Sequence, residues 1–204
     1  EKTCCSLMDE AGSLMEKSPA ELIHFFPSHN LLKASVGLAT INALANYENT
    51  EKREGDIIEF LNLKADDRVG IIGDFKPLVK EIEKITDKIF IFEKRKTGSK
   101  YFVMESEMAN ILPSCRVVLI TATSLVNKTF EPLIELIKSV PSCAMLGPST
   151  PLIPAFFADK GIKLLSGVEV VDVNKVLKIV SQAGGMKSFK DYIRKVNVFT
   201  GGNL

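Results

Sequence analysis

A dense group of small polar side chains follows one of the apolar runs of this 204-residue chain, and residues of these types can bind a polar ligand. The group consists of Thr121, Thr123, Ser124, Asn127 and Thr129. Hydroxyl and amide groups donate and accept hydrogen bonds, and a few of them facing one cavity fix the orientation of a small molecule. Thr129 is also suited to cap the helix that follows it, which would account for one member only. We predict that the other four bind a ligand; the alternative is that they cap helices and bond to neighbouring backbone.

A second candidate segment is rich in proline. It begins with Gly147, Pro148, Ser149 and Thr150, and further prolines follow at positions 151 and 154. Prolines at a spacing of three disfavour helical geometry in the residues before them, so the segment should be stiff and extended. A stiff loop loses little entropy when it binds a ligand, although the missing N–H groups make it a poor site for an anion. We predict a binding role for the first four residues, with a purely structural loop as the alternative.

A third candidate is the glycine-containing turn 70–75, which lies where a dinucleotide-binding fold would carry G-x-G-x-x-G. The turn has two glycines and lacks the third, and Asp74 would repel a pyrophosphate. The complete motif is therefore absent, and we predict that Gly73 and Phe75 contact a ligand in another way. The alternative is that the segment is only a tight turn, which needs the flexibility of glycine. Glu93 follows Gly73 by about 20 residues, where an acid that binds ribose would lie, although the basic segment 94–96 follows at once. Gly167 completes the predicted ligand contacts.

The potential ligands for a metal ion are four cysteines and two histidines, and no C-x-x-C or H-x-x-x-H spacing occurs among them. Cys4 and Cys5 are adjacent and could offer two thiolates to a soft metal, with His24 or His29 assisting. The other two cysteines, at 115 and 143, begin apolar runs and are expected to be buried. The sequence therefore predicts Cys4 and Cys5 as the metal-binding residues.

These residues require a fold that places them together, and the apolar pattern predicts one. Five short apolar runs alternate with amphipathic helical stretches; the runs are 69–72, 89–92, 117–120, 143–146 and 162–165. This alternation predicts an α/β fold with a doubly wound, Rossmann-like parallel sheet over residues 65–204. Residues 1–64 instead have helical spacing and predict a small, mainly helical domain. Ligands of such sheets bind at the carboxyl ends of the strands, where most of the polar candidates fall.

Composition excludes several functional classes. Twenty-six Lys and Arg against 25 Asp and Glu leave a formal charge of +1, which argues against a nucleic-acid partner. No apolar run reaches the ~18 residues of a membrane span, so no membrane partner is expected. Four cysteines form no disulfide framework, and the expected location is the cytoplasm. We expect a small molecule or a metal as partner and leave a homodimer open.

Several ordered motifs resemble a known prokaryotic family. They lie at 36–44, 55–56, 67–73, 92–93, 121–127, 147–151 and 167. The chain resembles a family of unknown function labelled "putative heavy-metal chelation". The resemblance implies an N-terminal domain like that of enolase, a Rossmann-like C-terminal domain, and roles in metal handling or anaerobic cobalamin-type cofactor synthesis. The strands that would open the enolase-like domain are not visible before Cys4, so they would lie upstream of this sequence.

Three functional hypotheses remain open at this point. The first is a protein that binds a small ligand or a heavy-metal chelate in a cleft between the two domains, mainly through residues 121–129 and 147–151. The second is an enzyme that uses a nucleotide-type cofactor in the same crevice. The third is a subunit whose activity depends on a partner in an assembly. The incomplete glycine motif and the lack of an evident acid/base pair favour binding, and no catalytic residue is predicted.

Overall fold

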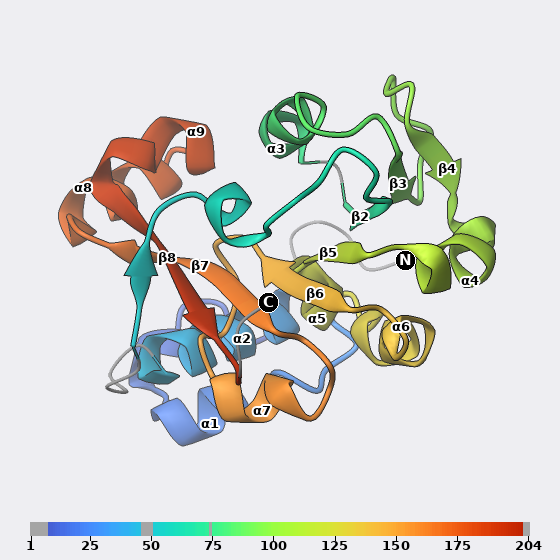
Figure 1. The fold of residues 1–204 in the computed structure, drawn as a ribbon. Helices are drawn as coiled ribbons and strands as arrows, with labels where there is room; N and C mark the ends of the chain where they lie inside the picture. Colours follow the sequence, from blue (N-terminus) through green and yellow to red (C-terminus); the bar gives the residue numbers. More distant parts are fainter. Residues whose placement is uncertain (1–7, 46–50, 74, 202–204) are drawn as a thin grey trace.

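A mainly parallel sheet forms the centre of the molecule in the computed structural model, which describes residues 8–45, 51–73 and 75–201 (Figure 1). Its strands are β1 (Arg53–Glu54), β2 (Val69–Ile72), β3 (Ile89–Glu93), β4 (Phe102–Met104), β5 (Val117–Thr121), β6 (Ser142–Leu146), β7 (Leu164–Val170) and β8 (Ile193–Phe199). The helices are α1 (Pro19–Ile23), α2 (Leu31–Ala45), α3 (Lys76–Ile82), α4 (Met108–Ile111), α5 (Thr123–Val126), α6 (Phe130–Ile137), α7 (Pro154–Ala158), α8 (Val173–Val180) and α9 (Met186–Phe189). Short 3-10 turns are η2 (Leu14–Glu16), η3 (Ile57–Phe60), η4 (Glu105–Glu107), η5 (Leu112–Ser114) and η6 (Lys190–Tyr192).

The strand order is β1-β8-β7-β6-β5-β2-β3-β4, and the six strands from β2 to β7 are parallel. Numbered along the chain, those six have the order 3-2-1-4-5-6, which is the order of dinucleotide-binding Rossmann folds. The predicted α/β fold with a doubly wound sheet is therefore confirmed. Its topological switch point lies between β2 and β5, which are neighbours although their crossovers leave in opposite directions.

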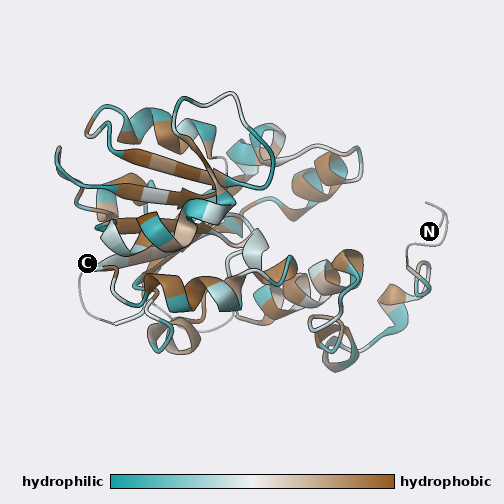
Figure 2. Ribbon diagram, turned by 90° about the vertical axis from the view of Figure 1, so that its right-hand side faces the viewer, coloured by the Kyte–Doolittle hydropathy of each residue, from teal (hydrophilic) through white to brown (hydrophobic). Residues whose placement is uncertain are grey.

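The central strands are apolar throughout because both faces of the sheet are covered. Val117 and Leu119 of β5 belong to one hydrophobic cluster, together with α3 and η3. Val118 and Ile120 belong to the other cluster, together with residues of α4, α6, α7 and α2. Figure 2 shows the strands as a mainly hydrophobic layer between helices that present both kinds of side chain. This two-sided burial explains why the runs lack the alternation of a half-exposed strand.

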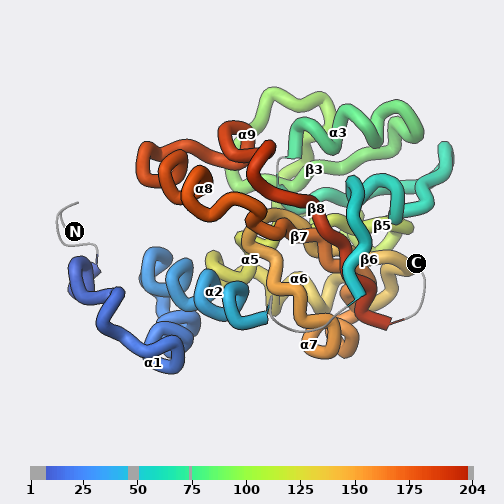
Figure 3. Tube along the Cα trace, turned by 90° about the vertical axis from the view of Figure 1, so that its left-hand side faces the viewer, coloured from blue at the N-terminus to red at the C-terminus, as the bar shows by residue number. Residues whose placement is uncertain are grey.

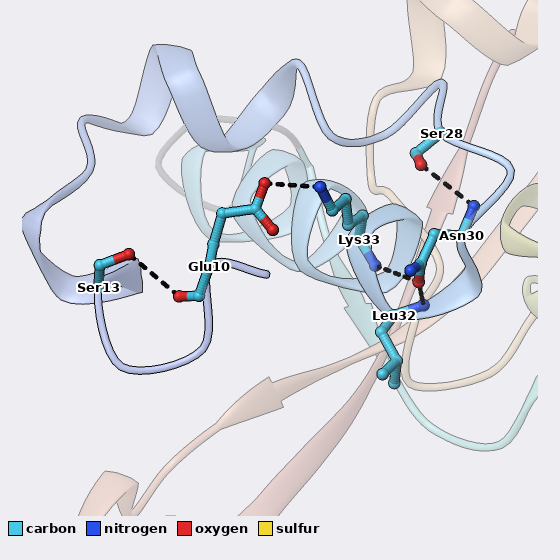
Figure 4. A network of polar contacts seen from close by, with 6 residues as sticks. All are labelled: Glu10, Ser13, Ser28, Asn30, Leu32 and Lys33. Carbon is cyan, nitrogen blue, oxygen red and sulfur yellow. Dashed lines mark hydrogen bonds and ion pairs between the residues drawn. The ribbon is translucent and has the colours of Figure 1, made fainter. Parts of the chain in front are cut away.

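The N-terminal helices begin where the sequence predicts. Ser18 and Glu21 form a capping box at α1, and Asn30 Oδ1 accepts from the Leu32 and Lys33 N–H groups at the start of α2 (Figure 4). Lys33 Nζ also lies 2.6 Å from Glu10 Oε1 in the same network. A methyl group on Gly37 would lie 2.3 Å from the Phe26 backbone nitrogen, so no larger residue fits at this position. Glycine thus lets α2 approach the end of α1.

Three features differ from the sequence-based expectation. Strands β1, β4 and β8 carry no long apolar run, because they lie at or beside the edges of the sheet. The Thr129 side chain makes no capping hydrogen bond at α6, so its expected role is wrong. Helix α8 forms as predicted, but its apolar residues remain exposed, with Leu177 at 62%.

The domain boundary at residue 64 stays a prediction. Residues of η3 pack into the same cluster as β2 and α3, and β1 pairs with β8. The chain between residues 53 and 61 therefore packs with the sheet. Within the described residues, no helix has both the length and the apolar character that crossing a bilayer requires.

Candidate functional site at the carboxyl edge of the sheet

The ends of β2 and β5 touch at the switch point. Gly73 has φ +110°, and a methyl group there would lie 3.1 Å from Thr121 Cβ and 3.2 Å from Phe75 Cε2. The Gly73 N–H donates to Phe92 O of the neighbouring strand at 3.1 Å, which holds the turn against β3. The structure thus brings Gly73, Phe75 and Thr121 together, three residues selected from the sequence. Open sheets of this topology bind ligands at this point.

The polar group after β5 divides into exposed and buried members. The Thr121 and Thr123 hydroxyls lie 2.9 Å apart; Thr121 is half-buried, and Thr123 and Asn127 are exposed. Ser124 is 1% exposed, and its Oγ has no hydrogen-bond partner among the described residues. The two threonine hydroxyls can therefore bond to a ligand at the edge, whereas Ser124 faces the interior.

The proline-rich segment after β6 is a turn that contacts helix α2. Gly147 has φ +123° and its N–H donates to Ser166 O, and the Thr150 N–H closes the turn by donating to Gly147 O at 3.0 Å. Asn42 Nδ2 of α2 donates to Ser149 O at 2.9 Å, while Pro148 is exposed. Thr150 is 4% exposed, and its Oγ1 has no hydrogen-bond partner within the described part of the chain. The segment is therefore tied to the N-terminal helices, as a site between the two parts requires.

Two further predicted residues lie on strands. Glu93 ends β3 and is half-buried, one strand away from Gly73. Gly167 is buried within β7, where a methyl group would lie 3.1 Å from Leu152 Cδ2. This contact shows that Gly167 makes room for Leu152 in the core.

An apolar cavity of about 420 Å³ lies where the N-terminal helices meet the α/β part. Phe26, Leu38 and Ile41 of the N-terminal helices line one side of it. Lys128 and Pro151, from the predicted segments 121–129 and 147–151, line the other side. None of the predicted hydroxyl residues lines it. The two segments therefore contribute to one cavity beside α2, and that cavity is apolar. Figures 1 and 3 show α2 beside α5, with α7 close by.

The described residues do not fit a bare metal ion. They contain no group of three or more His, Cys, Asp or Glu side chains that could hold one. Burial raises the pKa of Cys115 to about 11 and that of Cys143 to about 12, so both remain protonated thiols near neutral pH and are poor metal ligands. Cys4 and Cys5, the predicted metal ligands, lie outside the described residues. His24 and His29 are exposed in the helical N-terminal part.

Two residues near this edge escaped the sequence analysis. Asn42 bonds to a residue 107 positions away, and Lys128 donates to Phe26 O, 102 positions away. Asn42 lies in an alanine-rich helix and Lys128 in a polar turn, so only the tertiary contact distinguishes them. No local signal marks Asn42, because α2 also carries Lys33, Ser35 and Thr40.

Comparison with known families agrees with this fold. The DUF364 family model, described as "Putative heavy-metal chelation", matches residues 56–199. The chain belongs to the DUF364 family. A second model with the same description, DUF4213, matches residues 2–45 of this DUF364 member. Residues 46–55, between α2 and η3, separate the two matches.

Three relatives of this DUF364 protein are described as uncharacterised or of unknown function. An uncharacterised protein of Methanocaldococcus jannaschii is 25% identical over 190 residues, which cover 89% of this chain and 71% of the relative. A DUF364 protein of unknown function from Desulfitobacterium hafniense has a crystal structure with a TM-score of 0.76 and 29% identity. That match covers 89% of this chain and 73% of the other. A further DUF364 crystal structure, from Pyrococcus horikoshii, has a TM-score of 0.79 at 24% identity, covers 92% and 77% of the two chains, and supports the fold.

Proposed function

We propose that this DUF364 protein binds a small polar ligand at the carboxyl edge of its sheet, and that the ligand carries a heavy metal as a chelate. One observation carries the proposal: the switch point brings Gly73 against Thr121, with the Thr121 and Thr123 hydroxyls beside it. A glycine at this place lets a ligand approach the backbone, and the hydroxyls supply directional hydrogen bonds. Metal handling and cobalamin-type cofactor synthesis, which the resemblance implies, belong to this proposal.

A chelate suits the chemistry of the edge better than a free ion. The described residues offer hydroxyls and backbone groups there and no cluster of three metal-binding side chains. Soft heavy metals prefer thiolate and imidazole ligands, so a ligand that already surrounds the metal would supply the missing donors. Cys4 and Cys5 remain proposed as two further thiolate ligands from the N-terminal segment. The reducing conditions that they need accord with the proposed cytoplasmic location.

The remaining predicted residues have subordinate roles in this proposal. Phe75 forms an apolar wall beside Gly73, and Glu93 presents a carboxylate at the end of the next strand. Ser149 and Thr150 belong to the turn that Asn42 connects to α2. Through that hydrogen bond the N-terminal helices support one side of the site.

The experiment is native mass spectrometry with elemental analysis of protein purified without oxygen. We expect a metal and a small molecule in equal amounts with the wild-type chain. The Thr121→Val/Thr123→Val variant should lose most of this occupancy with little change in melting temperature, because valine keeps the shape and removes the hydroxyl. Ser114→Ala, which removes an exposed hydroxyl at the opposite end of the sheet, is the matched control. Equal occupancy in all three proteins would contradict the proposed site.

The cysteines are tested separately. The Cys4→Ser/Cys5→Ser variant should keep its fold and lose soft-metal content if the two thiolates are ligands. Unchanged metal content would remove them from the site and leave the proposal for the sheet edge intact.

A nucleotide-type cofactor is the second candidate, favoured by the 3-2-1-4-5-6 strand order and by Glu93 at the end of the second strand. Against it stands the incomplete glycine motif. A ligand at 100 times its Kd stabilises the folded state by about 2.7 kcal/mol, which a melting experiment resolves. We expect no shift with millimolar NAD or NADP. A clear shift would place this candidate first.

A further inference from the structure

The apolar cavity beside α2 has the size and lining of a small-molecule pocket and is distinct from the polar edge. Its volume of about 420 Å³ falls within the roughly 300–1,000 Å³ that is typical of ligand pockets. Leu38, Phe130 and Phe157 are nearly inaccessible to water and form its floor.

The lining favours an apolar body in the ligand. The Phe130 and Phe157 rings meet edge to face with centroids 5.9 Å apart, and Phe156 meets Phe157 in the same manner at 5.0 Å. These contacts hold the rings as a preformed wall. Phe156 is 52% exposed and stands at the open side. A hydrocarbon chain entering past Phe156 would displace water from aromatic and aliphatic surface, which is favourable in proportion to the area covered.

The mouth of the cavity carries the Lys128 ammonium, which pairs with no carboxylate in the described part of the chain. Lys128 Nζ lies 4.2 Å from the centre of the Phe26 ring and donates to Phe26 O. Burial lowers the pKa of Lys128, and no carboxylate of the described residues forms an ion pair with it. An ammonium group has three N–H donors, so Lys128 can keep Phe26 O and still donate to a ligand.

The other charged groups at the mouth also favour a ligand with an anionic group. Glu131 lines the cavity, and its Oε1 lies 4.0 Å from Lys160 Nζ. The same Lys160 ammonium lies 4.9 Å from the centre of the Phe156 ring. Two lysines and one glutamate therefore surround the opening, and an anionic group is favoured over a cationic one.

We infer that this cavity binds a carboxylate with an apolar body, of the medium-chain fatty acid class, with its carboxylate at Lys128. The inference is independent of the proposed chelate site, because none of the hydroxyl residues at the sheet edge lines the cavity. It assigns a second ligand to the protein, bound between the N-terminal helices and the α/β part. A ligand there would add contacts between these two parts.

The test is calorimetric titration of the protein with decanoate below its micelle concentration, with decylammonium as the probe of opposite charge. We expect one decanoate per chain and an affinity at least about tenfold higher than that of decylammonium, a difference of about 1.4 kcal/mol. Lys128→Gln should reduce the decanoate affinity about tenfold and leave that of decanol unchanged, because only the charge contact is lost. Lys138→Gln removes an exposed charge that is paired with Glu135 and should change neither.

Two further variants separate the cavity from the rest of the surface. Ile41→Phe places a larger side chain into the cavity and should abolish decanoate binding, whereas Leu44→Phe adds the same bulk at a position of α2 that does not line it. Leu177→Ser removes apolar surface from the exposed face of α8 and should leave binding unchanged. No decanoate binding by the wild-type protein, equal binding of both charged probes, or loss of binding in Leu177→Ser would each overturn the inference. Melting curves of each variant without ligand verify the fold, and the chelate occupancy of the same variants should stay unchanged.

Discussion

The two ends of the same parallel sheet use polar side chains in opposite ways. At the amino end, Asp67 accepts from the Lys64 N–H and pairs with Arg116 Nε, both at 2.7 Å, and its backbone oxygen accepts from Thr86. Arg116 also donates to Asn62 O at 2.6 Å. These contacts join the loops before β2, β3 and β5 to one another.

At the carboxyl end, the Gly73 and Gly147 N–H groups bond to neighbouring strands, and two hydroxyls near the end of β5 bond within their own turn. Thr121 and Thr123 bond to each other, and Gly73 and Gly147 adopt positive φ angles that other residues rarely take. Glycine adopts these angles without strain, whereas the buried Ser124 and Thr150 hydroxyls, which have no hydrogen-bond partner among the described residues, reduce stability. Polar contacts at the amino end thus stabilise the sheet, whereas the carboxyl end is where we propose the ligand site.

The largest expected loss of stability comes from a substitution at the amino end of the sheet. Asp67→Ala removes the partner of Arg116 and the acceptor for the Lys64 N–H, and should lower the free energy of unfolding by about 3 kcal/mol. Denaturant unfolding measures this loss. The control is Asp66→Ala, whose exposed carboxyl pairs with the exposed Lys88, so its effect should stay within about 0.5 kcal/mol. Similar losses in both variants would show that the buried position of Asp67 has no special value.

A medium effect is expected from the glycines of the carboxyl end. Gly73→Ala combines a strained φ with a contact of 3.1 Å to Thr121 and should cost about 2 kcal/mol. Gly147→Ala has similar strain, but its methyl group would meet only Ala122 Cβ at 4.0 Å, so about 1 kcal/mol is expected. Thermal unfolding measures both losses: Gly147→Ala shows the cost of backbone strain alone, and Gly73→Ala shows the cost of strain together with a steric clash. Equal losses of stability in the two variants would contradict this, because they would mean that Gly73 and Thr121 can move apart without a free-energy cost.

The smallest effect concerns acid pH at the carboxyl end of β7. The hydrogen bond from Lys52 and the contact with Arg194 lower the pKa of Glu169 below its ordinary value of 4.5. A depressed pKa contributes stability above about pH 4.5, and this contribution is lost as pH falls through the folded-state pKa. Glu169→Gln should therefore lose slightly less stability on acidification than the wild type, by under about 1 kcal/mol. Parallel pH profiles of the two proteins would contradict this role.

The sequence predicts the central strands and the helix starts well because these depend on local patterns. Five apolar runs became β2, β3, β5, β6 and the beginning of β7, since a strand buried on both faces needs apolar residues at every position. Ser18, Asn30 and Asp56 each cap a helical turn through residues only two or three positions away, so local sequence suffices to indicate such starts. The edge strand β4 was missed because its side chains are only partly buried. Strand β8 was missed because Asn197 interrupts its buried residues Val196 and Val198, so no continuous apolar run marks it.

For the candidate site, the sequence alone determined which residues lie after strands of a parallel sheet, because chain direction places all those turns at one edge. Only the tertiary structure decided which of these turns meet. It brought Gly73 to Thr121, turned Ser124 and Thr150 inward, and joined Ser149 to Asn42 across 107 positions. It also created an apolar cavity from Phe26, Leu38 and Lys128 that no local pattern indicates. Such contacts depend on the order of the strands and the placement of α2, which result from packing between distant segments and leave no periodic signal in the chain.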